Sequence, residues 1–179
     1  MSRRRAIAVA VATVIFAAVA ALTLALVRGG SATPSAGSAA SGVSTSAPLE
    51  LSRNDPITGR TVSLAAYAGT PIVLNMWASW CTGCYAEARA LATFERTHPQ
   101  AQVVGVDIQD SKAAARAFYR RYGWRHPSIF DPNGLIAARF QLQGLPATLF
   151  LDRSHRVVAR ILGETNLAGF DRGLERALG

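Results

Sequence analysis

An apolar run, Pro71–Met76, leads within five residues to a pair of cysteines, and no other feature of the sequence constrains the fold more. A strand that is apolar on both faces is typical of the centre of a sheet whose two sides are both covered. From Cys81 to about Thr97 the chain has no glycine or proline after Gly83, and its apolar residues recur at near-helical spacing. The sequence therefore predicts a buried strand that runs directly into a helix, with both cysteines at the start of that helix.

The patterns that follow predict an α/β domain with a small mixed sheet covered on both sides by helices. Strands are indicated by short apolar runs between turn residues, and helices by an apolar face preceded by a capping side chain. In chain order, the predicted elements are a strand at Gln102–Ile108, a helix from Ser111 to about Tyr122, a turn at Asp131–Gly134, a helical piece at Leu135–Phe140, a hairpin of Ala147–Leu151 with Val157–Leu162, and a last helix that begins at Thr165 or Asn166. The core-facing side of the helix from Ser111 is predicted to carry Ala114, Ala117, Phe118 and Tyr122.

Before the buried strand, the sequence predicts a short hairpin. A turn signal at Asp55–Gly59 precedes Arg60–Ser63, which is typical of two paired strands joined by a tight turn. Ser63 is placed to cap a brief helix, Leu64–Ala68, which Gly69 ends.

Residues 1–28 carry the pattern of an N-terminal transmembrane signal anchor. Arginines precede an apolar run of 22 residues, Ala6–Val27. A helix of that length, at about 1.5 Å per residue, spans a hydrocarbon core of about 30 Å, whereas a cleaved signal peptide has an apolar stretch of about 7–15 residues. The small residues at Ser31–Ala40 are also compatible with cleavage. The excess of arginine before the run predicts a single-pass protein of the cell membrane, with its C-terminal domain on the extracytoplasmic side.

Composition separates a linker from a folded domain. Residues 29–48 are almost wholly Gly, Ser, Ala, Thr and Pro, so we expect a flexible linker there and a folded domain at 49–179.

Of the net charge of +8, four arginines in the first 30 residues supply half. No block of basic residues interleaves with aromatic residues, which argues against nucleic acid as a partner.

The spacing of the two cysteines, Cys81 and Cys84, indicates redox chemistry, half of a metal site, or a chance pair. The first turn of a helix offers unpaired N–H groups and the positive end of the dipole, and both favour a thiolate. A lowered pKa on an exposed first cysteine makes such a pair reactive, and the second cysteine is then close enough to resolve a mixed disulfide. Trp77 and Trp80 flank the pair, and we expect them to shield the second sulfur and to shape a peptide-facing surface.

A zinc site would need further ligands that the sequence does not place near the cysteines. Structural zinc takes four ligands, and His98, His126 and His155 each lack a local partner. We therefore expect no metal, and no cofactor other than the Cys81–Cys84 disulfide itself.

Several separate motifs, in the same order along residues 49–179, resemble the TlpA/ResA-like branch of the thioredoxin family. The segment Leu74–Cys84 resembles the active-site segment of that branch. The other matching segments are Gly59–Leu64 for its N-terminal hairpin, Val103–Asp107 for its second strand, Phe130–Gly134 for its central insert, and Gly144–Asp152 for its cis-proline loop and the strand after it. The resemblance implies a thioredoxin-like fold: a central mixed sheet flanked by helices, with an N-terminal hairpin and a central insert.

The resemblance also implies roles for individual residues. It implies that the Leu145–Pro146 bond is cis and faces the cysteine pair, where the backbone of Leu145, with Trp80 nearby, could bind an extended substrate peptide. It further implies that Glu87 is a buried carboxyl with a raised pKa that exchanges a proton with Cys84. The local sequence alone would instead place Glu87 on the solvated surface.

The implied activity is thiol–disulfide exchange on exported proteins. The leading role is to keep thiols reduced for cytochrome c maturation, with apocytochrome c as substrate and a membrane thiol reductase as the source of electrons. A disulfide-forming or isomerising oxidant, served by a membrane oxidase, is the alternative. Many members of this branch have proline directly before the second cysteine, where this chain has Gly83. That dipeptide influences the reduction potential, so the direction of electron flow stays open.

Three other classes of protein fit the sequence less well. A peroxiredoxin shares the fold but requires a threonine-x-x-cysteine arrangement, which Ser79–Thr82 cannot provide. A copper-binding assembly factor, which is a non-enzymatic metallochaperone, would use a different cysteine spacing and a distant histidine. A purely structural tether would gain nothing from a reactive cysteine pair.

Overall fold

The computed structural model describes residues 48–179. The predicted signal anchor, and the predicted linker apart from Pro48, lie outside the described residues. Within residues 48–179, no helix combines the length and the apolar character that a membrane span requires.

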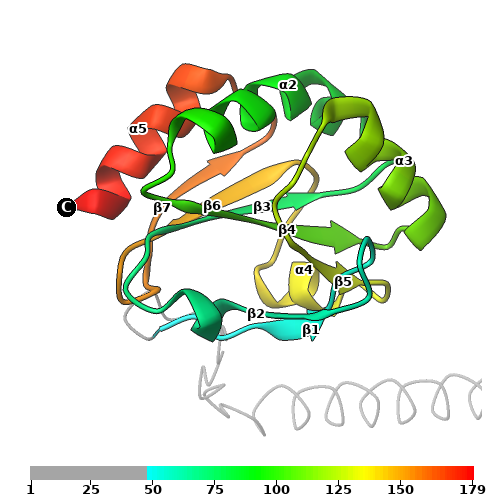
Figure 1. Ribbon diagram of the computed structural model, residues 1–179, viewed down its shortest axis with the longest axis horizontal. Helices are drawn as coiled ribbons and strands as arrows, with labels where there is room; N and C mark the ends of the chain where they lie inside the picture. The colour runs from blue at the N-terminus through cyan, green and yellow to red at the C-terminus, as the bar shows by residue number, and fades with distance from the viewer. Residues whose placement is uncertain (1–47) are drawn as a thin grey trace, which may run out of the picture. The chain divides into compact units, whose positions relative to one another are not determined.

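A five-stranded mixed sheet forms the centre of the domain, in the order β5-β4-β3-β6-β7 (Figure 1). Its strands are β3 (Ile72–Trp77), β4 (Gln102–Ile108), β5 (Ser128–Asp131), β6 (Ala147–Leu151) and β7 (Val157–Leu162). β3, β4 and β5 are parallel, whereas β6 is antiparallel to both β3 and β7. All six residues of β3 are buried, which confirms the central strand predicted from the apolar run.

Alternate residues of β3 face two separate cores, because successive side chains of a strand point to opposite sides of the sheet. Val73 and Trp77 face one core, which is covered by α2 (Thr82–Thr97), α3 (Lys112–Tyr122) and α5 (Leu167–Leu178). Leu74 and Met76 face the other core. That second core is covered by the hairpin of β1 (Ser52–Asn54) and β2 (Thr61–Ser63), the short 3₁₀ helix η1 (Leu64–Tyr67) and α4 (Leu135–Arg139). Figure 1 shows α2, α3 and α5 on one side of the sheet and the β1–β2 hairpin and α4 on the other.

The pairing of β3 brings two loops to the same edge of the sheet. Because β3 and β4 are parallel, Trp77 lies opposite Asp107, and both strands end at this edge. Because β6 is antiparallel to β3, Ala147 at its start lies opposite Met76 near the end of β3. The loop after β3, which carries Cys81, therefore lies beside the loop before β6.

The predicted caps of α3 and α5 are confirmed. The Ser111 hydroxyl accepts a hydrogen bond from the Ala114 N–H at 3.2 Å. Of the two residues left open for α5, Asn166 is the cap, and its side-chain oxygen accepts from the Gly169 N–H at 3.0 Å.

One strand was missed, one predicted cap was wrong, and one predicted helix face was right only in part. Strand β5 was not foreseen: it is a four-residue edge strand that pairs only with β4, so it leaves little periodicity in the sequence. Ser63 does not cap the short helix with its side chain, and the Leu64 N–H donates instead to the Leu51 carbonyl at 3.0 Å. On α3 the predicted residues Phe118 and Tyr122 do face the core, but the buried face also includes Ala115 and Tyr119, and Ala117 is exposed. The helix is thus rotated about its axis relative to the predicted orientation, because the rings of Phe118 and Tyr119 pack against Trp77.

Candidate active site

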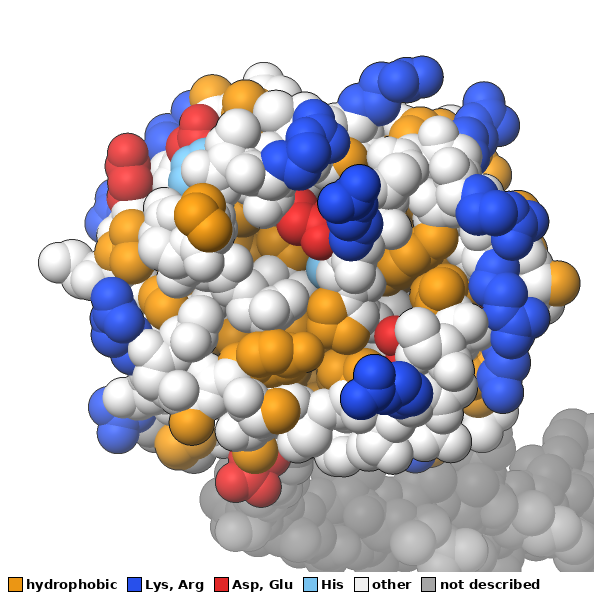
Figure 2. Space-filling view, in the orientation of Figure 1, with side chains coloured by type: hydrophobic (Ala, Val, Ile, Leu, Met, Phe, Trp, Pro, Cys, Tyr) orange, Lys and Arg blue, Asp and Glu red, His pale blue; other side chains and the backbone are white. Residues whose placement is uncertain are grey.

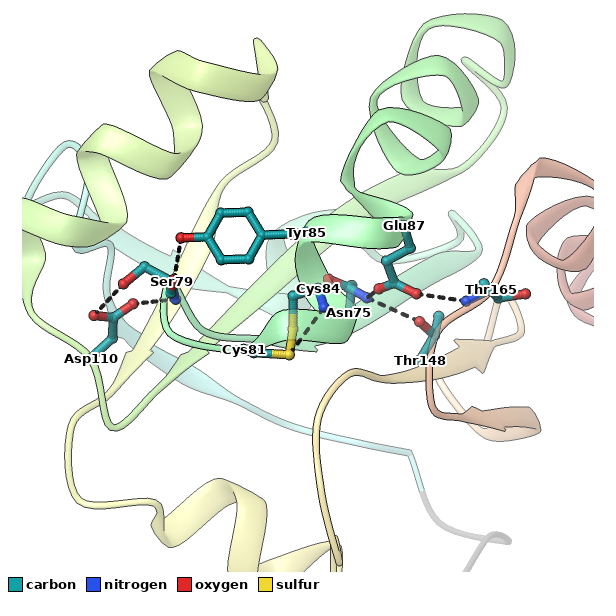
Figure 3. Close-up of a disulfide and its surroundings, with 9 residues drawn as sticks. All are labelled: Asn75, Ser79, Cys81, Cys84, Tyr85, Glu87, Asp110, Thr148 and Thr165. Carbon is teal, nitrogen blue, oxygen red and sulfur yellow. Dashed lines mark hydrogen bonds between the residues drawn. A yellow bond between two sulfur atoms is a disulfide. The ribbon is translucent and has the colours of Figure 1, made fainter.

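Cys81 and Cys84 form a disulfide at the N-terminus of α2 (Figure 3). Cys81 is the N-cap residue, and its Sγ accepts a hydrogen bond from the Cys84 N–H at 3.1 Å. Cys84 is fully buried, whereas Cys81 keeps 4% of its surface exposed. Cys81 is therefore the more accessible of the two cysteines, although it is far less exposed than the sequence analysis expected of the first cysteine.

The loop before Cys81 is fixed by groups from two other elements. The Ser79 N–H donates to Asp110 Oδ2 at 2.6 Å, and the Ser79 hydroxyl donates to Asp110 Oδ1 at 2.9 Å. From the first turn of α2, the Tyr85 hydroxyl donates to the Ser79 carbonyl at 2.6 Å (Figure 3). The sequence analysis missed Asp110 and Tyr85. The position of Asp110, two residues after β4, was the available signal, since parallel strands end at one edge.

The two tryptophans before Cys81 differ in position. The side chain of Trp80 is 58% exposed, and its indole N–H donates to the Gln109 carbonyl at 3.1 Å. Trp77 is fully buried, with its ring centre 4.9 Å from that of Phe118 and 5.1 Å from that of Trp124. The prediction that both tryptophans shape a surface beside the disulfide is therefore wrong for Trp77. As the last residue of β3, Trp77 points into the core beneath α3.

The loop before β6 contacts the turn between the cysteines. The Leu145–Pro146 peptide bond is cis, as the resemblance implied. A Cβ atom on residue 83 would lie 2.8 Å from Cδ of Pro146, closer than side-chain carbons approach in practice. Glycine at this position therefore permits the close approach of the cis-proline loop to the helix N-terminus.

Glu87 is buried behind the disulfide, with 1% of its surface exposed, so the implied burial is confirmed and the surface interpretation is wrong. Its Oε1 accepts a hydrogen bond from Asn75 Nδ2 at 2.8 Å, and its Oε2 accepts from the Thr165 N–H at 3.1 Å (Figure 3). The Asn75 amide also donates to the Thr148 hydroxyl at 3.0 Å. Three segments far apart in the sequence thus hold this one carboxyl group.

Burial raises the pKa of Glu87 from 4.5 to about 7. The hydrogen bonds from Asn75 and Thr165 oppose this rise, and the charge of Glu164 adds to it. A carboxyl group with a pKa near 7 can both accept and release a proton at neutral pH.

Metal ligands do not gather in the part of the chain that the structure describes. Among residues 48–179, no group of three or more His, Cys, Asp or Glu side chains is arranged to hold a metal ion.

Comparisons with known proteins give a consistent result. The profile of the AhpC/TSA family matches residues 44–160. The thiol:disulfide interchange protein DsbE of Vibrio cholerae is 28% identical over 109 residues, which cover 60% of this chain and 58% of that protein. The thiol-disulfide oxidoreductase ResA of Bacillus subtilis is 27% identical over 108 residues, which cover 59% of this chain and 60% of ResA. The chain thus spans about three fifths of the length of these curated relatives.

A solved structure confirms the fold. The crystal structure of a DsbF homologue from Corynebacterium diphtheriae superimposes with a TM-score of 0.67 at 30% sequence identity. The match covers 72% of this chain and 85% of that one. The thioredoxin-like fold implied by the motifs is therefore confirmed.

The burial of Glu87 predicts a pH-dependent stability that Glu87→Gln should remove. The pKa of this carboxyl is raised in the folded state to about 7. Its contribution to the free energy of unfolding is therefore fully present below pH 4.5 and is lost as the pH rises through 7. As the pH rises from acidic to mildly alkaline values, the oxidised wild type should therefore lose about 3 kcal/mol of unfolding free energy relative to the oxidised variant. Denaturant unfolding of both proteins at several pH values measures this difference.

The comparison isolates Glu87, because Asp107, whose pKa burial raises to about 8, titrates in both proteins. Parallel stability curves for the two proteins would show that Glu87 does not titrate in this range.

Proposed function

Because the chain belongs to the AhpC/TSA family and to the ResA/TlpA-like branch of the thioredoxin family, we propose that it is a thiol–disulfide oxidoreductase. Its redox group is the Cys81–Cys84 disulfide. The observation that carries the proposal is the placement of that disulfide at a helix N-terminus, with its more accessible cysteine beside a cis-proline loop. The N–H groups of the helix start favour the thiolate that the reaction requires.

The exchange proceeds through a mixed disulfide on Cys81. In the reducing direction, the Cys81 thiolate attacks a substrate disulfide, a Cys81–substrate bond forms, and one substrate thiolate leaves. The Cys84 thiolate then attacks the Cys81 sulfur, which restores the Cys81–Cys84 disulfide and releases the second substrate thiol. Two electrons pass from the cysteine pair to the substrate, and the same steps reversed oxidise a substrate dithiol. The burial of Cys84 restricts it to this resolving step.

Residues around Cys81 bind the substrate segment. The backbone of Leu145, directly before Pro146, can pair with an extended peptide as an added strand would. Trp80, exposed beside Cys81, offers an apolar surface to the same peptide. Trp80 lies in the loop after β3 and Leu145 in the loop before β6. Both residues lie near Cys81 because these two loops are at the same edge of the sheet.

Substituting one cysteine at a time tests the order of events. We expect Cys84→Ser to accumulate a mixed disulfide with a peptide substrate, because the resolving thiol is lost, whereas Cys81→Ser should form none. Non-reducing gel electrophoresis and mass spectrometry measure the adduct. Full turnover by the Cys84→Ser variant would contradict the proposed sequence of steps.

Glu87 serves as the proton carrier for Cys84. Both residues lie on α2, and Glu87 follows Cys84 by three residues. When the disulfide opens, the buried thiolate of Cys84 takes a proton from Glu87, and it returns that proton before it attacks Cys81. We expect Glu87→Gln to slow exchange about tenfold or more at neutral pH and to remove an inflection near pH 7 from the pH–rate profile. Glu175→Gln, which removes an exposed carboxyl from α5, is the matched control. An unchanged inflection in the Glu87→Gln profile would contradict the role.

The physiological role that we propose is exchange on exported proteins outside the cytoplasm. The sequence supports this location through the arginines and the apolar run Ala6–Val27, which predict a membrane anchor. Within that setting, the role we favour is reduction of an apocytochrome c disulfide to its two thiols for cytochrome c maturation, with electrons from a membrane thiol reductase. The relationship to DsbE and ResA supports the exchange chemistry on which this role depends.

The reduction potential of the Cys81–Cys84 disulfide tests the direction of electron flow. A reductant should have a potential near that of thioredoxin, about −270 mV, because it must give its electrons to substrate disulfides. Equilibration of the full-length protein with glutathione or dithiothreitol redox buffers measures this value. A potential near −120 mV, roughly that of the oxidant DsbA, would instead assign a disulfide-forming role.

A further inference from the structure

Two arginines lie on the α2–α3 side of the disulfide, each with its guanidinium over a tyrosine ring. Cζ of Arg121 is 5.6 Å from the ring centre of Tyr85 and 5.6 Å from that of Tyr122. Cζ of Arg89 lies 6.0 Å from the ring centre of Tyr122. These distances are typical of cation–π contacts. We call Tyr85, Arg89, Arg121 and Tyr122 the arginine–tyrosine platform.

The platform is connected directly to the reactive loop. Tyr85 lies one helical turn after Cys81, and its hydroxyl donates to the Ser79 carbonyl at 2.6 Å. Arg89 is one turn further along the same helix, about 6 Å beyond Tyr85 at 1.5 Å per residue. A substrate segment that reaches Cys81 from this side therefore passes over the platform.

Neither guanidinium of the platform is paired with a carboxylate among the described residues. Among the described residues, no carboxylate oxygen lies within 4.0 Å of Arg89 or Arg121, and neither side chain donates a hydrogen bond. Stacking on the face of a ring leaves the N–H groups at the edge of the guanidinium able to bind a carboxylate in bidentate fashion. The rings also hold these side chains in place, which lowers the entropy lost when a partner binds.

The flank on the other side of the disulfide carries the opposite charge. Glu164, an exposed residue in the loop between β7 and α5, has its Oε2 only 3.3 Å from where a Cβ of residue 83 would lie. On the α3 side, by contrast, residues 111–130 contain five Lys and Arg residues and no acidic residue. Figure 2 shows basic side chains along the edge of the domain at which α3 lies in Figure 1. Glu164 thus lies on one side of the disulfide, and the guanidinium groups of Arg89 and Arg121 lie on the other. On the arginine side the carboxylate of Asp110 already accepts two hydrogen bonds from Ser79.

We propose that the arginine–tyrosine platform binds acidic side chains of the exported protein that exchanges with Cys81. The preferred partner then carries Asp or Glu close to its reacting cysteine, on the side that lies over α2 and α3. The acidic flank at Glu164 disfavours the opposite placement of such a segment, so the charges also orient the partner. This inference rests on the proposed function, because it names the partner of the same Cys81 site.

Peptide disulfides that differ only in charge test the inference. Three peptides of equal length carry two Glu, two Gln or two Lys residues beside the reacting cysteine, and the reduced full-length protein is mixed with each. We expect the second-order rate constant for the Glu peptide to exceed that for the Lys peptide about tenfold at low ionic strength. This ratio should shrink in about 1 M salt, where the Debye length falls to about 3 Å.

Charge-neutral variants assign the preference to the platform. In the double variant Arg89→Gln/Arg121→Gln, the rate constants for the three peptides should converge. The matched control is Arg156→Gln/Arg176→Gln, which removes the same charge from exposed residues before β7 and in the last turn of α5, far from Cys81 along both elements. This control should keep the order Glu, Gln, Lys.

Each other result has a defined meaning. Equal rate constants for the three peptides in the wild type, or an unchanged order in the Arg89→Gln/Arg121→Gln variant, would overturn the acidic-partner inference and leave the proposed exchange activity intact. No exchange with any peptide would overturn the proposed function itself, and with it this inference.

Discussion

Strand β3 is paired on both sides, and the position of every group in the site depends on that pairing. Its parallel pairing with β4 places the loop before Cys81 beside Asp110, which binds that loop through Ser79. Its antiparallel pairing with β6 places Pro146 against Gly83. A shift of one residue in either register would turn the side chains of β3 to the wrong faces of the sheet. The geometry of the disulfide is therefore determined by the centre of the fold.

The same strand explains how a carboxyl group is tolerated in the core. Asn75 lies opposite Thr148 in the β3–β6 register, so both side chains point to the face that α2 covers. From there the Asn75 amide bridges Glu87 and Thr148. A buried carboxylate without partners would be far less stable than its protonated form. The hydrogen bonds moderate this penalty, and the result is a carboxyl group that is balanced between its two protonation states near neutral pH.

The site separates a buried chemical part from an exposed recognition part. Cys84 and Glu87 are buried, so the proton exchange that we propose between them would be shielded from solvent. Trp80 and three residues of the arginine–tyrosine platform, Tyr85, Arg89 and Arg121, are exposed on the side of Cys81, which is the more accessible of the two cysteines. The charges of Arg89 and Arg121 can change without altering the buried pair, since neither arginine belongs to the core. Partner choice and reaction chemistry can thus change independently in a domain of this design.

The sequence by itself determined the central strand, the helix that follows it, the cysteine pair at the junction and the cap of α3, and it narrowed the cap of α5 to two residues. These features depend on local signals: an apolar run, the residues that begin and end a helix, and a spacing within one turn. From residue patterns alone, Glu87 would have been assigned to the surface, and only the family resemblance indicated its burial. The short edge strand β5, the buried orientation of Trp77 and the contacts of Asp110 and Tyr85 with Ser79 were decided by the tertiary structure alone. The physical reason is that burial, register and side-chain contacts between distant segments depend on how the elements pack, and no local pattern encodes which surfaces meet.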